Sequence, residues 1–254
     1  MCATCGCGGE PQDHEHDHGE HHHHQDHDHH HHQDHDHHHH HHRVVRVEED
    51  VLAKNSRIAE RNRGWLAARR VLALNLVSSP GAGKTSLLER TLRESGFPAT
   101  VIEGDQATER DADRIRAAGA RAVQVNTGTG CHLDAEMVAR ALPELEPKPG
   151  SVVFIENVGN LVCPALFDLG ERAKVLVASV TEGDDKPLKY PHMFRAARLV
   201  LLNKVDLLPH VRFDPARFLA CVREVNPRVP VLHVSAEHGE GLSAWYGWLR
   251  DLHP

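Results

Sequence analysis

The chain has 254 residues, of which 40% are hydrophobic, and its formal net charge at pH 7 is −7. This length suggests one or two domains. No run of 18 apolar residues is present, which excludes a membrane-spanning helix. The sequence has neither the apolar core of a signal peptide nor a basic nucleic-acid footprint, so we expect a cytoplasmic protein with no membrane or nucleic-acid partner. The six cysteines are too scattered for a disulfide scaffold.

The first 42 residues differ from the rest of the chain in composition. They contain 9 acidic residues, no Lys or Arg, and 19 of the 25 histidines, which leaves 29 basic and 27 acidic residues in positions 43–254. The negative charge therefore belongs to a tail, and we predict two parts: a tail at 1–42 and a globular domain at 43–254.

The tail repeats the octapeptide Q-D-H-D-H-H-H-H at 25–32 and again at 33–40. It has almost nothing apolar to bury, so we expect it to be disordered. Neutral imidazoles bind nickel, copper, zinc and cobalt, and the interleaved carboxylates concentrate cations, which favours metal buffering. A purification tag is the alternative, but a tag does not normally follow two octapeptide repeats.

Three cysteines precede the histidines at C-x-x-C-x-C spacing: Cys2, Cys5 and Cys7. Three thiolates at this spacing can surround one soft or borderline divalent ion, with the α-amine as a fourth ligand. The alternative is a set of incidental cysteines at a frayed terminus.

The remainder of the chain shows an alternating α/β pattern. We predict a helix over 48–70, followed by strands at 71–77, 99–103, 121–125, 151–155, 174–179, 198–202 and 230–234. Their continuous apolar character is typical of strands buried on both faces, which predicts an α/β fold with a mostly parallel sheet flanked by helices. Ligand sites in such sheets lie at the carboxyl ends of the strands.

A phosphate-binding loop is predicted directly after the first strand. The segment S-S-P-G-A-G-K-T at 78–85 fits the P-loop pattern except that Ser78 replaces the first glycine. Lys84 is expected to reach the β- and γ-phosphates, and the hydroxyl of Thr85 to bind Mg²⁺. The other residues expected around the phosphates are Ser79, Gly81, Ala82, Gly83 and Ser86.

A guanine-recognition motif follows the sixth predicted strand. Asp206 can accept both N–H donors of guanine, Asn203 can approach N7, and Lys204 can cover the purine ring. Adenine lacks those donors and would leave the carboxylate unpaired. The pair Ser235 and Ala236 after the last strand completes the motif, so the predicted ligand is GTP or GDP.

Acidic residues at two strand ends are expected to complete the phosphate machinery. We place Asp105 near Mg²⁺ or the γ-phosphate, Glu156 as a Mg²⁺ partner, and the amide of Gly159 at the γ-phosphate. We assign catalytic roles to Lys84, Asp105 and Glu156. No glutamine stands out that would obviously orient the attacking water, so intrinsic hydrolysis is expected to be slow.

A second metal site is predicted beside the γ-phosphate. Cys131 and His132 follow the third strand and Cys163 follows the fourth, which provides two thiolates and one imidazole. This set is one ligand short of a closed tetrahedral site, and a symmetric dimer could supply the rest. The alternative is two structural cysteines and a capping histidine. Cys221 lies on a helical pattern and is predicted to be a core residue.

Taken together, these motifs resemble the HypB family, the GTPases of [NiFe]-hydrogenase maturation. The matching segments are S-S-P-G-A-G-K-T, E-G-D-Q-A-T-E-R-D-A-D-R-I, T-G-x-x-C-H-L-D, E-N-V-G-N-L-V-C-P and N-K-V-D, and the resemblance runs from about residue 45 to the C-terminus. The Cys2–Cys7 motif is similar to the N-terminal nickel motif of many members.

The resemblance implies a SIMIBI-class P-loop GTPase that dimerises with GTP and helps to deliver Ni²⁺ to the hydrogenase large-subunit precursor. It also implies a HypA-type nickel/zinc accessory protein as partner. Cys131, His132 and Cys163 correspond to the family's internal metal site, which can hold nickel or zinc. Three other functions stay open: a nickel storage protein with a regulatory G-domain, a urease-accessory-type GTPase, and a small-molecule kinase. The urease-type protein carries its ligands as Cys-Pro-His, whereas Ala165 follows Cys163-Pro164 here.

Overall fold

The computed structural model describes residues 37–105, 110–128 and 130–252; for residues 37–48, 105 and 110 it describes only the backbone. The predicted metal ligands Cys2, Cys5 and Cys7 and the octapeptide repeats up to residue 36 lie outside the described residues. The chain divides into two compact units, Met1–Val51 and Leu52–Pro254.

Helix α1 extends over His37–Ala68 and so begins earlier than the predicted helix at 48–70. The last six residues of the predicted tail are helical as a result. Extending an existing helix adds one backbone hydrogen bond per residue, whereas starting a new helix is costly, so a nucleated helix can continue into a sequence with no apolar pattern.

The globular unit is built on a sheet of seven strands in the order β3-β2-β4-β1-β5-β6-β7, and every neighbouring pair is parallel. All seven predicted strands are confirmed, each within two residues at either end. Their bounds are β1 Leu72–Ser78, β2 Ala99–Asp105, β3 Arg121–Asn126, β4 Val152–Glu156, β5 Ala173–Ser179, β6 Ala197–Asn203 and β7 Val231–His233.

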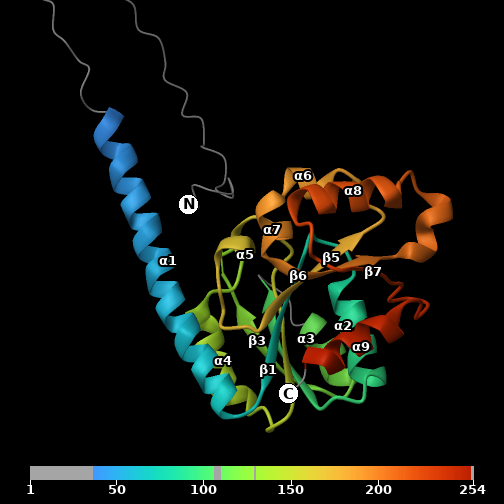
Figure 1. The fold of residues 1–254 in the computed structure, drawn as a ribbon. Coiled ribbons are helices and arrows are strands. Elements are labelled where there is room, and N and C mark those ends of the chain that lie inside the picture. The colour runs from blue at the N-terminus through green and yellow to red at the C-terminus, as the bar shows by residue number, and fades with distance from the viewer. Residues whose placement is uncertain (1–36, 106–109, 129, 253–254) are drawn as a thin grey trace, which may run out of the picture. The chain divides into compact units, whose positions relative to one another are not determined.

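Helices cover both faces of this sheet (Figure 1). On one face, α2, α3 and α9 contribute buried side chains to a cluster with β1 and β4; on the other, α4 packs toward β2–β4 and α7 and α8 toward β5–β6. The bounds are α2 Lys84–Glu94, α3 Arg110–Ala117, α4 Ala135–Leu145, α5 Cys163–Leu166, α6 Lys186–Lys189, α7 Pro191–Ala196, the 3-10 helix η1 Val205–His210, α8 Pro215–Val225 and α9 Leu242–Leu252. Cys221 is buried on α8, as the helical pattern predicts.

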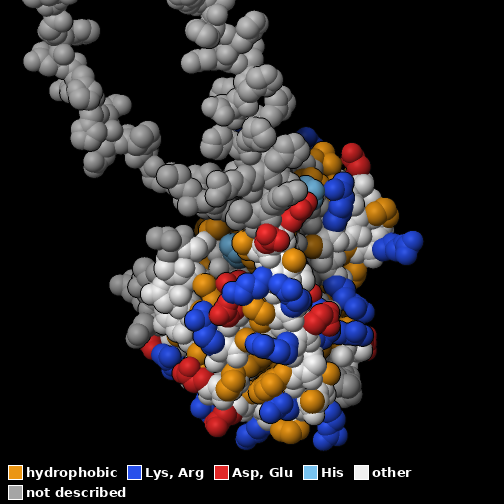
Figure 2. Space-filling model, turned by 90° about the vertical axis from the view of Figure 1, so that its left-hand side faces the viewer, with side chains coloured by type: hydrophobic (Ala, Val, Ile, Leu, Met, Phe, Trp, Pro, Cys, Tyr) orange, Lys and Arg blue, Asp and Glu red, His pale blue; other side chains and the backbone are white. Residues whose placement is uncertain are grey.

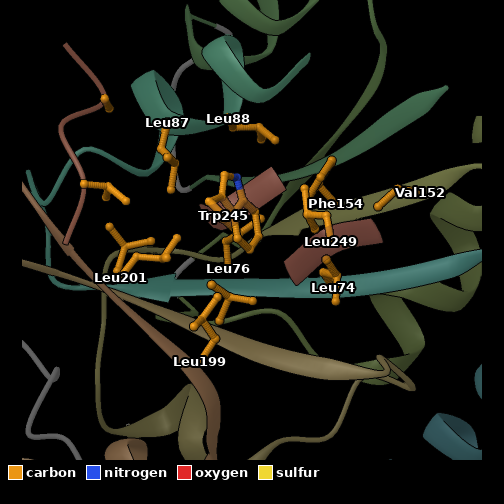
Figure 3. Close-up of a cluster of buried hydrophobic side chains, with 14 of the residues drawn as sticks. Leu74, Leu76, Leu87, Leu88, Val152, Phe154, Leu199, Leu201, Trp245 and Leu249 are labelled. Atoms are coloured by element: carbon orange, nitrogen blue, oxygen red, sulfur yellow. The ribbon is translucent and has the colours of Figure 1, made fainter. Parts of the chain in front are cut away.

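Trp245 of α9 lies at the centre of the larger hydrophobic cluster, among leucines of β1, α2 and β6 (Figure 3). Its side chain is fully buried, and its indole N–H donates a 2.9 Å hydrogen bond to Thr91 Oγ1. Truncating a buried tryptophan to alanine typically costs about 3–5 kcal/mol. The cluster therefore fixes α2, and with it the loop that precedes α2, against the sheet.

The strand order places several loops of the chain together. β1 lies between β4 and β5, and β2 lies on the far side of β4, so that the carboxyl ends of β1, β2 and β4 lie side by side at the same edge of the sheet. All of these strands are parallel, so that edge is their carboxyl edge, where ligands bind in open α/β sheets.

None of the described helices combines the length and the apolar character needed to cross a membrane. On the face shown in Figure 2, Lys and Arg side chains are interspersed with Asp and Glu side chains. A continuous basic surface, which is the usual footprint of nucleic-acid binding, is therefore not seen on that face among the described residues.

Candidate nucleotide and metal site

A cavity of about 600 Å³ opens at the carboxyl edge of the sheet. The end of β2, the loops after β1, β3, β4 and β6, and the start of α2 and α3 contribute its walls. The lining residues are Pro80, Gly81, Gly83, Lys84, Thr85, Ser86, Glu103, Gly104, Asp111, Arg114, Cys131, Glu156, Asn157, Val158, Gly159, Asn160 and Lys204. Most predicted phosphate-binding residues therefore surround one cavity.

The P-loop passes directly from β1 into α2. Gly83 precedes the first residue of α2 with φ 95°, a left-handed conformation that suits glycine. A Cβ at this position would lie 2.5 Å from Asn203 Nδ2, so a side chain has no room there. Gly83 and the first residues of α2 line the cavity, so the positive end of the helix dipole lies at its wall.

Two lysines hold the P-loop from opposite ends. Lys84 Nζ donates to Ser78 Oγ at 2.9 Å, and Lys204 Nζ donates to the Gly81 carbonyl at 2.7 Å. A third lysine, Lys186 at the start of α6, donates to Ser79 Oγ and pairs with Glu182 at 2.7 Å. Three ammonium groups thus contact this loop, which suits a ligand that carries several negative charges.

Glu103 and Glu156 form a buried carboxyl pair beneath the P-loop. Thr85 Oγ1 donates a 2.7 Å hydrogen bond to Glu156 Oε1. Burial and the neighbouring Glu156 raise the pKa of Glu103 to about 11, and burial also raises the pKa of Glu156 against the opposing effect of Lys84. Two neighbouring buried carboxyl groups disfavour each other's ionisation, and a cation bound between them would offset this effect.

The carboxyl pair fits the divalent cation that accompanies nucleoside phosphates. Glu103 Oε2 and Glu156 Oε2 are both buried without a hydrogen-bond partner. Oxygen ligands from carboxylate and hydroxyl groups are the ones that Mg²⁺ prefers. Thr85, Glu156 and Glu103 therefore provide a suitable oxygen set. Asp105 is the last residue of β2, and its side chain lies outside the described part of the chain.

The predicted guanine-recognition residues meet across the P-loop. Asn203 donates to the Ala82 carbonyl at 2.9 Å and accepts from the Ala236 amide at 3.0 Å, so it links the P-loop to the loop after β7. Asp206 Oδ1 is buried without a hydrogen-bond partner, which suits an acceptor for a base N–H. His238 Nε2 lies 3.8 Å from Asp206 Oδ2. Ser235 is fully buried and caps the turn through the His238 amide.

The structure brings Cys131, His132 and Cys163 together. The two sulfur atoms are 3.3 Å apart, Cys131 Sγ is 3.7 Å from His132 Nδ1, and one ligand atom of each residue lies within 4.8 Å of the others. Two thiolates on a tetrahedral ion with bonds of about 2.3 Å lie about 3.8 Å apart. The spacing of the three groups therefore fits a single nickel or zinc ion.

Burial lowers the pKa of His132, so the imidazole is neutral at pH 7 and its lone pair can bind a metal. The ring of Phe167 lies 4.1 Å from the His132 ring, centroid to centroid. Asp134 begins α4 by accepting from the Met137 amide at 2.7 Å, which ends the loop that carries two of the ligands. The loop that carries Cys131 and His132 is thus fixed at two points, by the contact between the His132 and Phe167 rings and by the Asp134 cap of α4.

The metal group and the phosphate cavity share a wall. Cys131 lines the cavity, and Asn160 donates to the Cys131 carbonyl at 3.4 Å. Gly159 lies so close to the P-loop that a Cβ there would be 3.0 Å from Pro80 Cα. The segment between Glu156 and Cys163 therefore extends from the P-loop to the metal ligands.

Several residues around the cavity are not among the predicted ones. Glu103 had a signal in the sequence, because a carboxylate ends an otherwise apolar strand. Arg114 had no signal in the sequence that pointed to the cavity. Its guanidinium pairs with Glu89 at 2.8 Å and donates to Ser86 Oγ at 3.4 Å. Lys186 follows β5 and reaches the P-loop only through the order of strands in the sheet.

Comparison with known proteins agrees with this geometry. Residues 72–233 match the family described as "CobW/HypB/UreG, nucleotide-binding domain". The hydrogenase maturation factor HypB of Escherichia coli K12 is 61% identical over 210 residues, which cover 82% of this chain and 72% of that protein. The chain belongs to the HypB family. This HypB-family protein therefore carries a P-loop nucleotide-binding domain of the class found in hydrogenase maturation factors.

Solved structures resemble the same domain. The crystal structure of HypB from Helicobacter pylori in complex with nickel has a TM-score of 0.75 and 36% sequence identity, and the match covers 78% of this chain and 94% of that one. FtsY from Mycoplasma mycoides has a TM-score of 0.50 at 14% identity over 66% of this chain and 62% of that one, a likeness of fold alone. This HypB-family protein has the SIMIBI-class fold predicted above.

Proposed function

We propose that this HypB-family protein is a GTP-hydrolysing nickel metallochaperone that helps to insert Ni²⁺ into the [NiFe]-hydrogenase large subunit. The observation that carries the proposal is that Cys131 belongs both to the Cys-His-Cys group and to the wall of the P-loop cavity. A change at the γ-phosphate can therefore reach the metal ligands through directly contacting residues.

Hydrolysis of GTP to GDP and phosphate is assigned to the P-loop cavity. Lys84 neutralises charge on the β- and γ-phosphates, the amides from Gly81 to Ser86 surround the phosphate oxygens, and the Gly159 amide donates to the γ-phosphate. Asp206 selects guanine through its buried, unpartnered oxygen. Asp105 at the end of β2 is the remaining residue that we assign to the γ-phosphate.

Mg²⁺ would be held by Thr85 and Glu156, with Glu103 close enough to contribute its unpartnered oxygen. When bound, the ion neutralises charge on the phosphate oxygens. A bound cation would favour the ionised forms of Glu103 and Glu156. Binding of the cation is therefore expected to release a proton from the pair. A slow intrinsic rate of hydrolysis remains part of the proposal.

Nickel is the cargo of the internal site, formed by Cys131, His132 and Cys163, and zinc can occupy the same ligands. The three ligands leave a tetrahedral ion open at one position, which suits exchange with a partner rather than permanent storage. We infer that the protein acts in the cytoplasm as a GTP-dependent homodimer with a HypA-type accessory protein and the large-subunit precursor. The nickel-bound relative from Helicobacter pylori supports nickel as the cargo.

The histidine-rich tail at 1–42, with Cys2, Cys5 and Cys7, is assigned to nickel buffering, and the domain at 43–254 to GTP binding and transfer. The 19 histidines of the tail also favour a second function, in which the protein mainly stores nickel and the G-domain is regulatory.

The proposal is tested by measuring Ni²⁺ binding to the full chain and to Cys163→Ala by equilibrium dialysis, with GDP and with a non-hydrolysable GTP analogue. The tail is the same in both proteins, so the difference isolates the internal site. We expect the affinity of that site to differ at least tenfold between the two nucleotides, which is about 1.4 kcal/mol of coupling. Equal affinities would remove nucleotide gating at equilibrium and favour storage.

A further inference from the structure

We propose that Asn157 couples the nucleotide cavity to the metal ligands, through a buried network of polar side chains that we call the amide network: Asn157, Asn75, Glu171 and Lys174. This inference rests on the proposed function, because it concerns the regulation of the same internal metal site. Asn157 is the residue after Glu156, lines the cavity, and is only 2% exposed.

Asn157 contacts the first metal-ligand loop directly. Its Oδ1 accepts a 3.1 Å hydrogen bond from the Leu133 amide, one residue beyond His132. The Asn157 amide in turn donates to the Leu76 carbonyl of β1 at 3.0 Å, which anchors its backbone in the sheet. A shift of the segment after β4 toward the γ-phosphate must therefore move the Cys131-His132 loop or break this bond.

The other end of the same side chain leads to the second metal-ligand loop. Asn157 Nδ2 donates to Asn75 Oδ1 at 3.3 Å, and Asn75 Nδ2 donates to Glu171 Oε1 at 3.2 Å. Glu171 Oε2 accepts from the Leu169 amide at 2.7 Å, in the segment that follows Cys163 and α5. The network thus crosses from β4 through β1 to the chain beyond the third ligand.

Lys174 connects the network to Phe167, the residue whose ring contacts His132. Its Nζ donates to Glu171 Oε1 at 2.6 Å and to the Phe167 carbonyl at 2.9 Å. Phe167 is the residue whose ring packs on His132. The Cys131-His132 loop is therefore bonded to Asn157 directly, and the chain beyond Cys163 is connected to Asn157 through the rest of the amide network. Asn157 itself lies on the wall of the nucleotide cavity.

The chemistry of the network favours coupling over simple packing. Asn75, Asn157 and Glu171 are all buried although their side chains are polar or charged. A buried polar group left without a partner costs about 1–3 kcal/mol, so the bonds are made or broken together. Two alternative arrangements of the network, one for each nucleotide, would meet the physical requirement for energetic coupling between sites.

The test uses the full chain and measures the affinity of a fluorescent GDP and of a fluorescent non-hydrolysable GTP analogue, each with and without saturating Ni²⁺. By linkage, nickel must change nucleotide affinity by the same factor by which nucleotide changes nickel affinity. We define the coupling factor as the nickel-induced change in the ratio of analogue affinity to GDP affinity. Cys163→Ala supplies the baseline, because its tail still binds nickel.

We expect a coupling factor of at least tenfold for the wild-type chain and of less than twofold for Asn157→Ala. Adding Cys163→Ala to Asn157→Ala should then change nothing further. The control is Asn226→Ala, which removes a partly buried amide at the end of α8 that donates to the Phe194 carbonyl at 3.0 Å, away from both sites. It should keep the wild-type factor.

Asn75→Ala is the second variant and covers the case in which Asn157→Ala fails to fold or to bind GDP. Asn75 lines neither the cavity nor the metal group, so a loss of coupling there cannot come from a lost ligand contact. A wild-type coupling factor retained in both variants overturns the role of the network and leaves the proposed function standing. A factor of one in the wild-type chain, with nucleotide still bound, overturns the nucleotide gating in the proposed function as well.

Discussion

Thr85 Oγ1 donates a 2.7 Å hydrogen bond to Glu156 Oε1, although the two residues are 71 positions apart in the sequence. One belongs to the first turn of α2 and the other ends β4, which pairs with β1 in the sheet. The bond fixes the side chain that we expect to bind Mg²⁺ against the carboxylate that we expect to share the ion. Both groups are thus oriented before any ligand arrives.

Replacing Lys84 should abolish GTP hydrolysis. Its ammonium lies at the start of α2 and contacts Ser78 across the loop, where the β- and γ-phosphates would be bound. Removing a donor of this kind typically lowers a turnover rate by about 100-fold or more. We expect Lys84→Ala to lose turnover, measured as phosphate release, while nickel binding to the tail stays unchanged.

The control for that experiment is Lys148→Ala, at an exposed lysine before β4 and outside the cavity. It should hydrolyse GTP at the wild-type rate. Unchanged turnover in Lys84→Ala would contradict the P-loop assignment.

Substitution of Asp206 by Asn should change the preferred base. The buried Oδ1 of Asp206 has no partner and is suited to accept a guanine N–H, whereas an amide N–H₂ in its place would face two donors. We expect Asp206→Asn to bind GDP on the order of 100-fold more weakly and to gain affinity for xanthosine diphosphate, whose base presents an acceptor instead. Competition titrations with both nucleotides measure the change, and equal weakening for both bases would show that the residue supports the fold rather than the base.

The raised pKa of Glu103, in the Glu103–Glu156 pair, should be visible in the pH dependence of the free energy of unfolding. Burial and the neighbouring Glu156 raise the pKa of Glu103 from its ordinary value of 4.5 to about 11, so between these values the folded state holds a proton that the unfolded chain has released. The free energy of unfolding must then fall as pH rises, by at most about 1.4 kcal/mol per pH unit for one proton. In EDTA and without nucleotide, we expect Glu103→Gln to become progressively more stable than the wild-type chain from pH 5 to pH 9.

Glu136→Gln is the comparison for this pH series. Glu136 is exposed, and its hydrogen bond with Lys54 lowers its pKa, so its charge changes little between pH 5 and pH 9 in either state. Its stability difference from the wild-type chain should stay constant over this range, as measured by thermal unfolding. A constant difference for Glu103→Gln as well would refute the raised pKa.

Deleting residues 8–42 should separate delivery from storage. We expect the shortened protein to lose most of its nickel capacity and still to activate hydrogenase at ample nickel, because transfer is assigned to the domain at 43–254. Full-length Lys84→Ala is the converse variant, with normal capacity and no activation. Activation by Lys84→Ala at ample nickel would favour the storage function, and an inactive deletion variant would make the tail essential for transfer.

Local patterns were enough to predict the fold class and most of the nucleotide site. The strands could be predicted because strands buried on both faces are continuously apolar, and Lys84 and Thr85 because the P-loop geometry requires glycines and a lysine at fixed spacing. The third ligand, Cys163, could be placed beside Cys131 and His132 because both loops follow strands of one parallel sheet. Each of these inferences uses residues that are neighbours in sequence or that end adjacent strands.

What the sequence alone could supply is therefore a set of predictions about the chemistry of the chain: a guanine nucleotide as ligand, a soft-metal site and metal binding by a histidine-rich tail. The tertiary structure decided which side chains act on each other. Glu103 approaches Glu156 because β2 pairs with β4, and Asn157 reaches Asn75 because β4 pairs with β1. A carboxylate or an amide has the same composition wherever it lies, but its pKa and its hydrogen bonds depend on neighbours that only the order of the strands brings within reach.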